Sequence, residues 1–158
     1  MTCGPDQFWA YDQSLGIWLK LLLDEVHERG WDQPGRPFAD DVHEWALAAV
    51  LGGNHGLDLG PGWNVEQRTA FAEVGEQVQD ALRSQGRLDP AEVGSWRLLD
   101  DQPIRRADGL GTGPRTVPIV DLGEALLQLV DGRLPPAPPG TWWMIGFADE
   151  RSTIAMRG

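Results

Sequence analysis

The sequence predicts an α+β fold in which an N-terminal three-helix unit packs on a small antiparallel sheet with one further helix. Before Gly86 the apolar residues recur at helical spacing, and after it they recur in shorter runs with the alternation of strands. Eight tryptophans in 158 residues favour a packed globular domain. We expect one domain over residues 1–158, helical at about 6–90 and mixed at about 91–158.

The first helix is predicted from Gln13 to Arg29, with Ser14 as its N-cap and Gly30 at its end. Its apolar stripe consists of Leu15, Trp18, Leu19, Leu22 and Val26. Further apolar residues flank that stripe, namely Ile17, Leu21 and Leu23. Because apolar side chains cover so much of its circumference, we expect this helix to be central and contacted from several sides.

The second helix is predicted to begin at Asp40 or Asp41 and to stop at Gly52 and Gly53. Its apolar face consists of Val42, Trp45, Ala46, Ala49 and Val50. The length suits a helix of about three turns. Because Trp18 and Trp45 lie on the apolar faces of the first two predicted helices, we expect both in the core.

The third helix is predicted from Val65 to Gln85. Asn64 followed by Gln67 at the third position is typical of a capping box, and Gly75 would permit a close helix approach. The apolar stripe consists of Phe71, Val74, Val78 and Leu82.

The pattern changes after Gly86. Asp89 and Pro90 suit the cap and first position of a short turn. Candidate strands follow at Ser95–Leu99 and Thr116–Val120, and a helix at 122–130 is expected to cover one sheet face. Four prolines make 134–140 an extended connection.

The chain is predicted to finish in a hairpin of Trp142–Phe147 and Arg151–Met156, with its turn at 148–150. Strand alternation assigns Trp143, Ile145 and Phe147 to an inward face, and Trp142 and Met144 to the opposite one. We therefore expect Trp142 to stay partly exposed at a surface for a partner or for self-association. Its replacement by alanine should cost less stability than that of Trp143.

The chain is strongly acidic, with a formal net charge of −11. Residues 1–94 hold 16 acidic and 6 basic residues, a net of −10, whereas residues 95–158 hold 8 and 7, a net of −1. Such a balance repels phosphate backbones and anionic lipids, so nucleic acid and membrane are not expected as partners. A basic protein would be attracted, although the acids also suit solvated helix faces.

Cys3 is the only cysteine, so an intramolecular disulfide is excluded. The start of the chain lacks the basic and apolar regions of a signal peptide, and no run of about 18 apolar residues could span a bilayer. These observations predict a cytoplasmic protein.

One group of residues could hold a divalent metal ion. If the first two helices form an antiparallel hairpin, their short connection gathers carboxylates and imidazoles at one end of it. The candidates are His27, Asp40, Asp41, His43 and Glu44. Acids at a helix start and a histidine at a helix end are also favoured by capping and by the helix dipole.

A second stretch could hold an anion. Residues 105–115 combine Arg105, Arg106 and Arg115 with three glycines, and amides in such a loop can point at a phosphate. The stretch lacks the lysine of a P-loop and the pattern of a dinucleotide site, so a plain connection is the alternative.

The leading functional hypothesis is a non-enzymatic, acidic protein-binding module, such as an immunity or antitoxin type inhibitor of a basic partner. Trp142 and Trp143, with Arg105, Arg106 and Arg115, are its candidate binding residues. The alternative is a small enzyme that uses the metal group or the glycine loop. We expect no cofactor under the first hypothesis, a divalent metal under the second, and a homodimer is possible under either.

Overall fold

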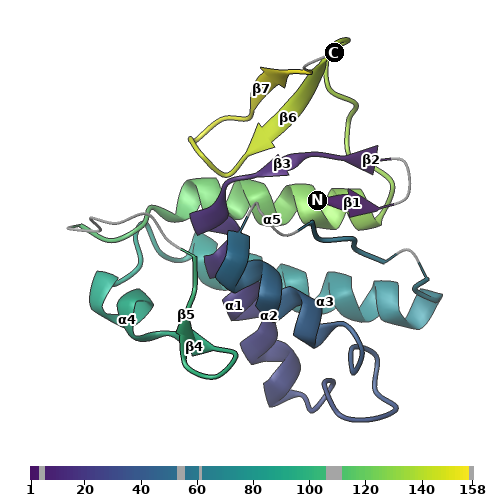
Figure 1. Cartoon of the computed structure of the whole chain (residues 1–158), viewed down its shortest axis with the longest axis vertical. Helices are drawn as coiled ribbons and strands as arrows, with labels where there is room; N and C mark the ends of the chain where they lie inside the picture. Colours follow the sequence, from purple (N-terminus) through teal and green to yellow (C-terminus); the bar gives the residue numbers. More distant parts are fainter. Residues whose placement is uncertain (4–5, 53–55, 61, 106–111, 157–158) are drawn as a thin grey trace.

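The computed structural model describes residues 1–3, 6–52, 56–60, 62–105 and 112–156. It has the α+β fold that the sequence predicts, with helices on one side of α5 (Thr116–Val130) and a small sheet on the other (Figure 1). Phe8, Trp45 and Ile145, which lie far apart in the sequence, belong to the same buried apolar cluster.

Helix α1 (Asp12–Glu28) lies at the centre and contacts α2 (Val42–Leu51), α3 (Val65–Arg83) and α5, as predicted. All five residues of its predicted stripe are buried. The predicted cap is wrong, because the helix begins at Asp12 and Ser14 lies inside it. The Ser14 hydroxyl instead donates to the carbonyl of Gly146 at 2.6 Å, which ties α1 to the end of the sheet.

The predicted capping box begins α3. The Asn64 side chain accepts from the Gln67 amide at 2.9 Å, and the Gln67 side chain accepts from the Asn64 amide at 3.1 Å. Gly75 permits the expected close approach, since a Cβ there would lie 2.6 Å from Cδ2 of Leu127 on α5. The stripe from Phe71 to Leu82 is buried as predicted.

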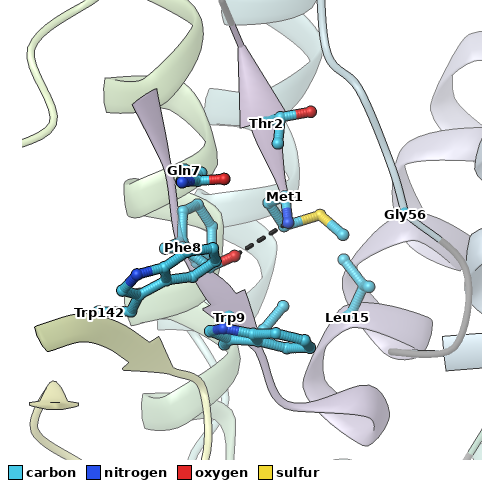
Figure 2. Close-up of a pocket in the computed structure, with 9 residues that line it drawn as sticks. Met1, Thr2, Gln7, Phe8, Trp9, Leu15, Gly56 and Trp142 are labelled. Carbon is cyan, nitrogen blue, oxygen red and sulfur yellow. Dashed lines mark hydrogen bonds between the residues drawn. The ribbon is translucent and has the colours of Figure 1, made fainter. Parts of the chain in front are cut away.

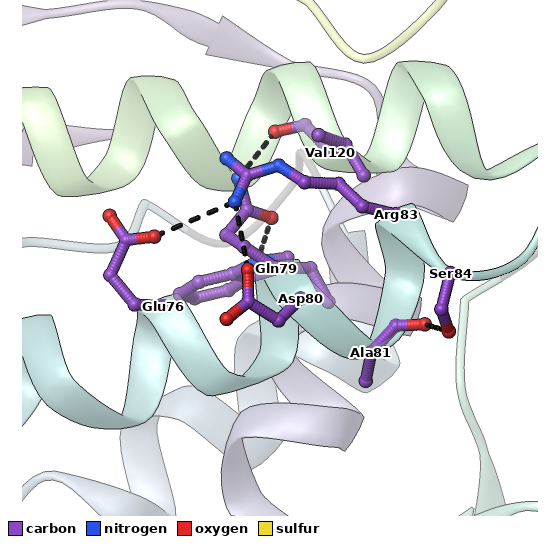
Figure 3. Close-up of polar contacts among 8 residues, drawn as sticks. Glu76, Gln79, Asp80, Ala81, Arg83, Ser84 and Val120 are labelled. Atoms are coloured by element: carbon purple, nitrogen blue, oxygen red, sulfur yellow. Dashed lines mark hydrogen bonds and ion pairs between the residues drawn. The ribbon is translucent and has the colours of Figure 1, made fainter.

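A buried glutamine connects the three central helices. The Trp18 indole of α1 donates to Oε1 of Gln79 at 3.3 Å, and the Gln79 amide donates to the Val120 carbonyl of α5 at 2.8 Å (Figure 3). Gly123 makes room for this arrangement, because a Cβ there would lie 2.1 Å from the Trp18 indole nitrogen. The polar atoms of the glutamine are therefore satisfied inside the core.

The strand predicted at Thr116–Val120 is wrong, because these residues form the first turns of α5. Their β-branched side chains are typical of a strand, and a proline such as Pro118 is disfavoured inside a helix. Pro118 is the third residue of α5, however, where a missing amide hydrogen leaves no helical hydrogen bond unmade. The helix predicted from residue 122 therefore begins six residues earlier.

The main sheet has the strand order β3 (Trp9–Ala10), β6 (Thr141–Ile145), β7 (Ser152–Ala155). The antiparallel β6–β7 hairpin is as predicted, but β3 joins β6 in parallel, so the sheet is mixed and includes the N-terminal region. Helix α5 lies against the inner side of the sheet (Figure 1).

The remaining elements are short. Strands β1 (Thr2–Cys3) and β2 (Asp6–Gln7) pair with each other near the N-terminus. Helix α4 (Pro90–Ser95) begins at the predicted Asp89 cap, whose side chain accepts from the Ala91 amide. Strands β4 (Arg97–Leu98) and β5 (Gln102–Pro103) form a separate hairpin, which shortens the strand predicted at 95–99.

Aromatic rings fill the region between α1, α2 and α3. Phe38 lies 5.1 Å from Trp45 and 5.6 Å from Trp63, measured between ring centroids, and Phe71 lies 5.1 Å from Trp63. Trp18 and Trp45 are buried as predicted. We call Trp18, Phe38, Trp45, Trp63 and Phe71 the interior aromatic cluster.

One carboxylate borders this cluster. The Trp63 indole donates to Oδ1 of Asp41 at 3.0 Å. Burial raises the pKa of the Asp41 carboxyl, the hydrogen bond from Trp63 opposes that rise, and the nearby charge of Asp40 adds to it.

Candidate interaction surface

The two faces of β6 have different surroundings. Ile145 is fully buried toward α5, and Trp143 packs against the core on the same face. Trp142 and Met144 alternate onto the opposite face. Pairing adds Trp9, opposite Met144, and Ile154, opposite Trp142, because paired residues share a face of a sheet.

We call this the outer sheet face and define it as Trp9, Trp142, Met144, Ile154 and Met156. Trp9 is 43% and Met156 52% exposed, and the other three side chains are half-buried. The rings of Trp9 and Trp142 lie 5.9 Å apart with 33° between their planes. Within the described residues no helix covers this face, so an apolar surface remains accessible to solvent (Figure 1).

The outer sheet face is hollowed around Trp142. A recess of about 500 Å³ is lined by Trp9, Trp142, Ile154, Ala155 and Met156. A neighbouring recess of about 290 Å³ lies between the two indoles and Met1, Phe8 and Leu15 (Figure 2). A third of about 230 Å³ adjoins the proline-rich segment 136–139 and is also lined by Trp142 and Met156. Trp142 therefore borders three adjoining hollows.

The assignment of Phe147 to the inward face is wrong. Strand β6 ends at Ile145, and Gly146 takes a left-handed φ of 89°, which turns the chain out of the strand. Phe147 is consequently 65% exposed and meets the Tyr11 ring edge-on, with centroids 5.1 Å apart.

The hairpin is held on the helices by a polar anchor at its turn. The Arg151 guanidinium donates to Oδ1 of Asp121 at 2.9 Å and to Oε1 of Gln128 at 3.2 Å. Both acceptors lie on α5, and the Arg151 and Asp121 side chains are each only 19% exposed. The anchor fixes β7, and with it one side of the outer sheet face.

The sheet and the helices differ in charge. Strands β3, β6 and β7 contain no charged residue. On the helices and loops, carboxylates of the chain pair with many of its bases, as in Arg83 with Glu76 and Asp80 (Figure 3). The other such bases include Lys20, Arg29, Arg105, Arg115, Arg133 and Arg151. Acids outnumber bases by 24 to 13, so such pairing leaves carboxylates in excess.

The residues of the predicted metal group lie at the end of α1 and at the start of α2. His27, at the end of α1, binds Oδ2 of Asp32 through Nδ1 at 2.8 Å. The hydrogen bond and the charge of Asp32 raise the pKa of the exposed His27. Asp40, His43 and Glu44 are exposed near the start of α2. In the described part of the chain, no three His, Cys, Asp or Glu side chains gather as they would around a metal ion.

The two described arginines of the predicted anion loop each face a carboxylate. The Arg105 guanidinium lies 3.7 Å from Oδ2 of Asp12, and that of Arg115 lies 2.5 Å from Oδ2 of Asp149. Arg106 and most of the glycine-rich stretch, residues 106–111, lie outside the described residues. The Arg105 amide donates to the Ala49 carbonyl at 2.7 Å, so its backbone serves the packing of α2.

Sequence reasoning singled out Trp142 but missed Trp9, Ile154 and Met156. Trp9 lies in a two-residue strand that pairs with a segment more than 130 residues away, and so short a strand has no periodicity to detect. Ile154 and Met156 do alternate with smaller residues in the predicted hairpin. That alternation could have placed them beside Trp142.

Within the described residues, no helix combines the length and the apolar character needed to traverse a lipid bilayer. Comparison of the chain with protein-family models, with curated proteins and with solved structures gives no match.

Proposed function

We propose that this chain is a non-enzymatic protein-binding module that attaches to a basic partner protein and occludes part of its surface, as an inhibitor of the immunity or antitoxin type does. One observation carries the proposal: Trp142 lies on the apolar outer sheet face, whose strands hold no charged residue, and borders three hollows of a strongly acidic chain.

The outer sheet face has the composition of the centre of a protein interface. Tryptophan and methionine are enriched at such centres, and a few buried aromatic anchors supply most of the binding energy. Trp9 and Trp142 are held by strand pairing and by contact with each other, so little side-chain freedom would be lost on binding. An apolar side chain of the partner would enter the recess beside Ile154 and Met156.

The charge of the chain favours a basic partner. Surplus carboxylates on the helices attract a positive protein over a range of about 8–10 Å at physiological salt. Such a field chiefly raises the association rate, whereas apolar anchors at the contact slow dissociation. The helices would therefore steer the partner, and the outer sheet face would retain it.

Affinity capture from native lysate of the source organism at about 50 mM salt tests the proposal. Trp142→Ala removes an anchor, and Phe147→Ala is the matched control, because Phe147 is an exposed aromatic side chain outside the outer sheet face. We expect the wild type and Phe147→Ala to retain the same basic protein, and Trp142→Ala to retain at least about tenfold less. Rising salt should release it.

Two outcomes contradict the proposal. One is the recovery of no basic protein at adequate depth. The other is equal retention by Trp142→Ala and the wild type, measured by titration with the purified captured protein. Equal retention would move the contact away from the outer sheet face.

A further inference from the structure

The second edge of the main sheet is formed by β7. In the described chain, β7 pairs with β6 on one side and with no strand on the other. The Met156 amide donates to the Gly140 carbonyl at 3.0 Å, and in an antiparallel pair such hydrogen-bonded positions alternate with positions whose backbone groups point away. The N–H and C=O groups of Thr153 and Ala155 therefore point to the free edge.

This edge lacks the features that usually prevent strand pairing. Natural edge strands are protected by charged side chains, prolines or bulges. Residues 152–156 read Ser-Thr-Ile-Ala-Met and contain neither a charge nor a proline. Of the two arginines that flank this segment, Arg151 is held by Asp121 and Gln128 of α5, which directs its charge away from the edge, and Arg157 lies outside the described residues.

We propose that β7 pairs antiparallel with β7 of a second copy of this chain. A twofold axis at Ile154 would set Thr153 of each copy opposite Ala155 of the other, which makes four backbone hydrogen bonds from the groups that point outward. The two Ile154 side chains would then meet across the axis as a non-hydrogen-bonded pair, the closer kind of cross-strand neighbour.

The uncharged strand favours a second copy over a strand from a basic protein. β7 offers no carboxylate to pair with a basic side chain, whereas the isoleucine of a second copy matches its own. The pairing would join two three-stranded sheets into one and place both Trp9–Trp142 pairs on a continuous face. This inference does not depend on the proposed function, although it would enlarge the surface offered to a basic partner.

The contact is small, because β7 has four residues. It falls below the roughly 1,200 Å² of total buried surface that stable complexes use, so we expect reversible self-association that is detectable only at high concentration. Net charge adds repulsion between copies. Salt should therefore strengthen self-association, whereas it weakens the binding of a basic partner.

Sedimentation equilibrium of the full chain from about 10 μM to about 1 mM tests the inference, in the range of weak complexes. Thr153→Pro removes the donor at the edge and none of the donors to β6, and proline is tolerated at such a position. Thr153→Val is the matched control that keeps the donor. We expect the wild type and Thr153→Val to dimerise, and Thr153→Pro to dimerise at least about tenfold more weakly.

Amide hydrogen exchange supplies a second readout that works even if Thr153→Pro does not fold. The Thr153 and Ala155 amides of the wild type should exchange more slowly as the protein concentration rises, while the Ile154 amide stays protected throughout. The inference is overturned if the wild type is monomeric at about 1 mM. It is also overturned if the exchange rates of the edge amides do not change with protein concentration. Salt should strengthen self-association and weaken the binding of a basic partner. The failure of this inference can therefore be told apart from the failure of the proposed function.

Discussion

Tryptophan has two different environments in this molecule. In the interior aromatic cluster, Trp18 and Trp45 are buried, and each packs against other rings. On the outer sheet face, Trp9 and Trp142 pack against each other, yet one side of the pair is open to water. The comparison shows that tryptophan has two separable settings here, because the first group stabilises the fold and the second leaves apolar surface open to solvent.

The two regions also differ in charge. The three helices around the interior cluster, α1, α2 and α3, carry nine acidic residues and three basic ones, whereas the strands of the outer face carry no charged residue. Charge and apolar anchors therefore lie in different parts of the molecule. Substitutions in the interior cluster should chiefly change the stability of the fold, and substitutions on the outer sheet face should chiefly change the binding of a partner.

The largest expected effect comes from the interior. Trp45→Ala removes a side chain that is 1% exposed and contacts Phe38, Trp63 and Phe71. Loss of its transfer energy and the cavity left behind should lower the free energy of unfolding by about 3–5 kcal/mol. Urea denaturation followed by circular dichroism measures it. A loss below about 1 kcal/mol would mean that the cluster is not a tightly packed core.

A smaller interior effect comes from overpacking. In Gly123→Ala the added methyl group would collide with the Trp18 indole nitrogen and with Oε1 of Gln79, 2.4 Å away. The shift of that hydrogen-bonded pair should cost about 1–3 kcal/mol. The matched control is Gly86→Ala, because no atom lies within 4 Å of the added methyl group. Gly132→Ala is less suitable, since Gly132 has a left-handed φ of 66°. Equal urea midpoints for the two variants would contradict the close approach of α1, α3 and α5.

The third prediction compares the two faces of one strand. Trp143 packs against the core and its indole donates to the Pro135 carbonyl at 2.8 Å, whereas Trp142 faces the hollows. Trp142→Ala should therefore lower the melting temperature less than Trp143→Ala does. Thermal melts of both variants decide this, and a larger loss for Trp142→Ala would mean that the faces are assigned the wrong way round.

Much of the helical region could be predicted because its signals are local. The stripe of α1 repeats from one helical turn to the next, and the Asn64–Gln67 capping box lies within a single turn. The beginning of α5 could not be predicted, because its β-branched residues favour a strand. It is packing against α1 and α3 that stabilises the helix there.

The candidate surface was predictable only in part for a similar reason. Alternation within the hairpin singles out Trp142, since that pattern is local. The parallel pairing of Trp9 with β6 and the turn at Gly146 depend on tertiary contacts. Such contacts leave no periodic mark in the sequence.

The smallest expected effect is a pH dependence at the edge of the helical region. Asp32 raises the pKa of His27, so the stabilising interaction is complete below the unfolded value of about 6.5 and is lost as the pH rises through the folded value. In Asp32→Asn, His27 should titrate at lower pH than in the wild type. Nuclear magnetic resonance titration of the His27 ring measures this, and identical midpoints would exclude the pair in solution.

The most direct test of the account follows the indole N–H signals by nuclear magnetic resonance with a soluble paramagnetic probe. In the dilute free chain, the probe should broaden the signals of Trp9 and Trp142 and spare those of Trp18 and Trp45. Adding the captured basic protein should protect Trp9 and Trp142 from broadening. If both signals stay as broad in the complex as in the free chain, the outer sheet face is not the binding surface.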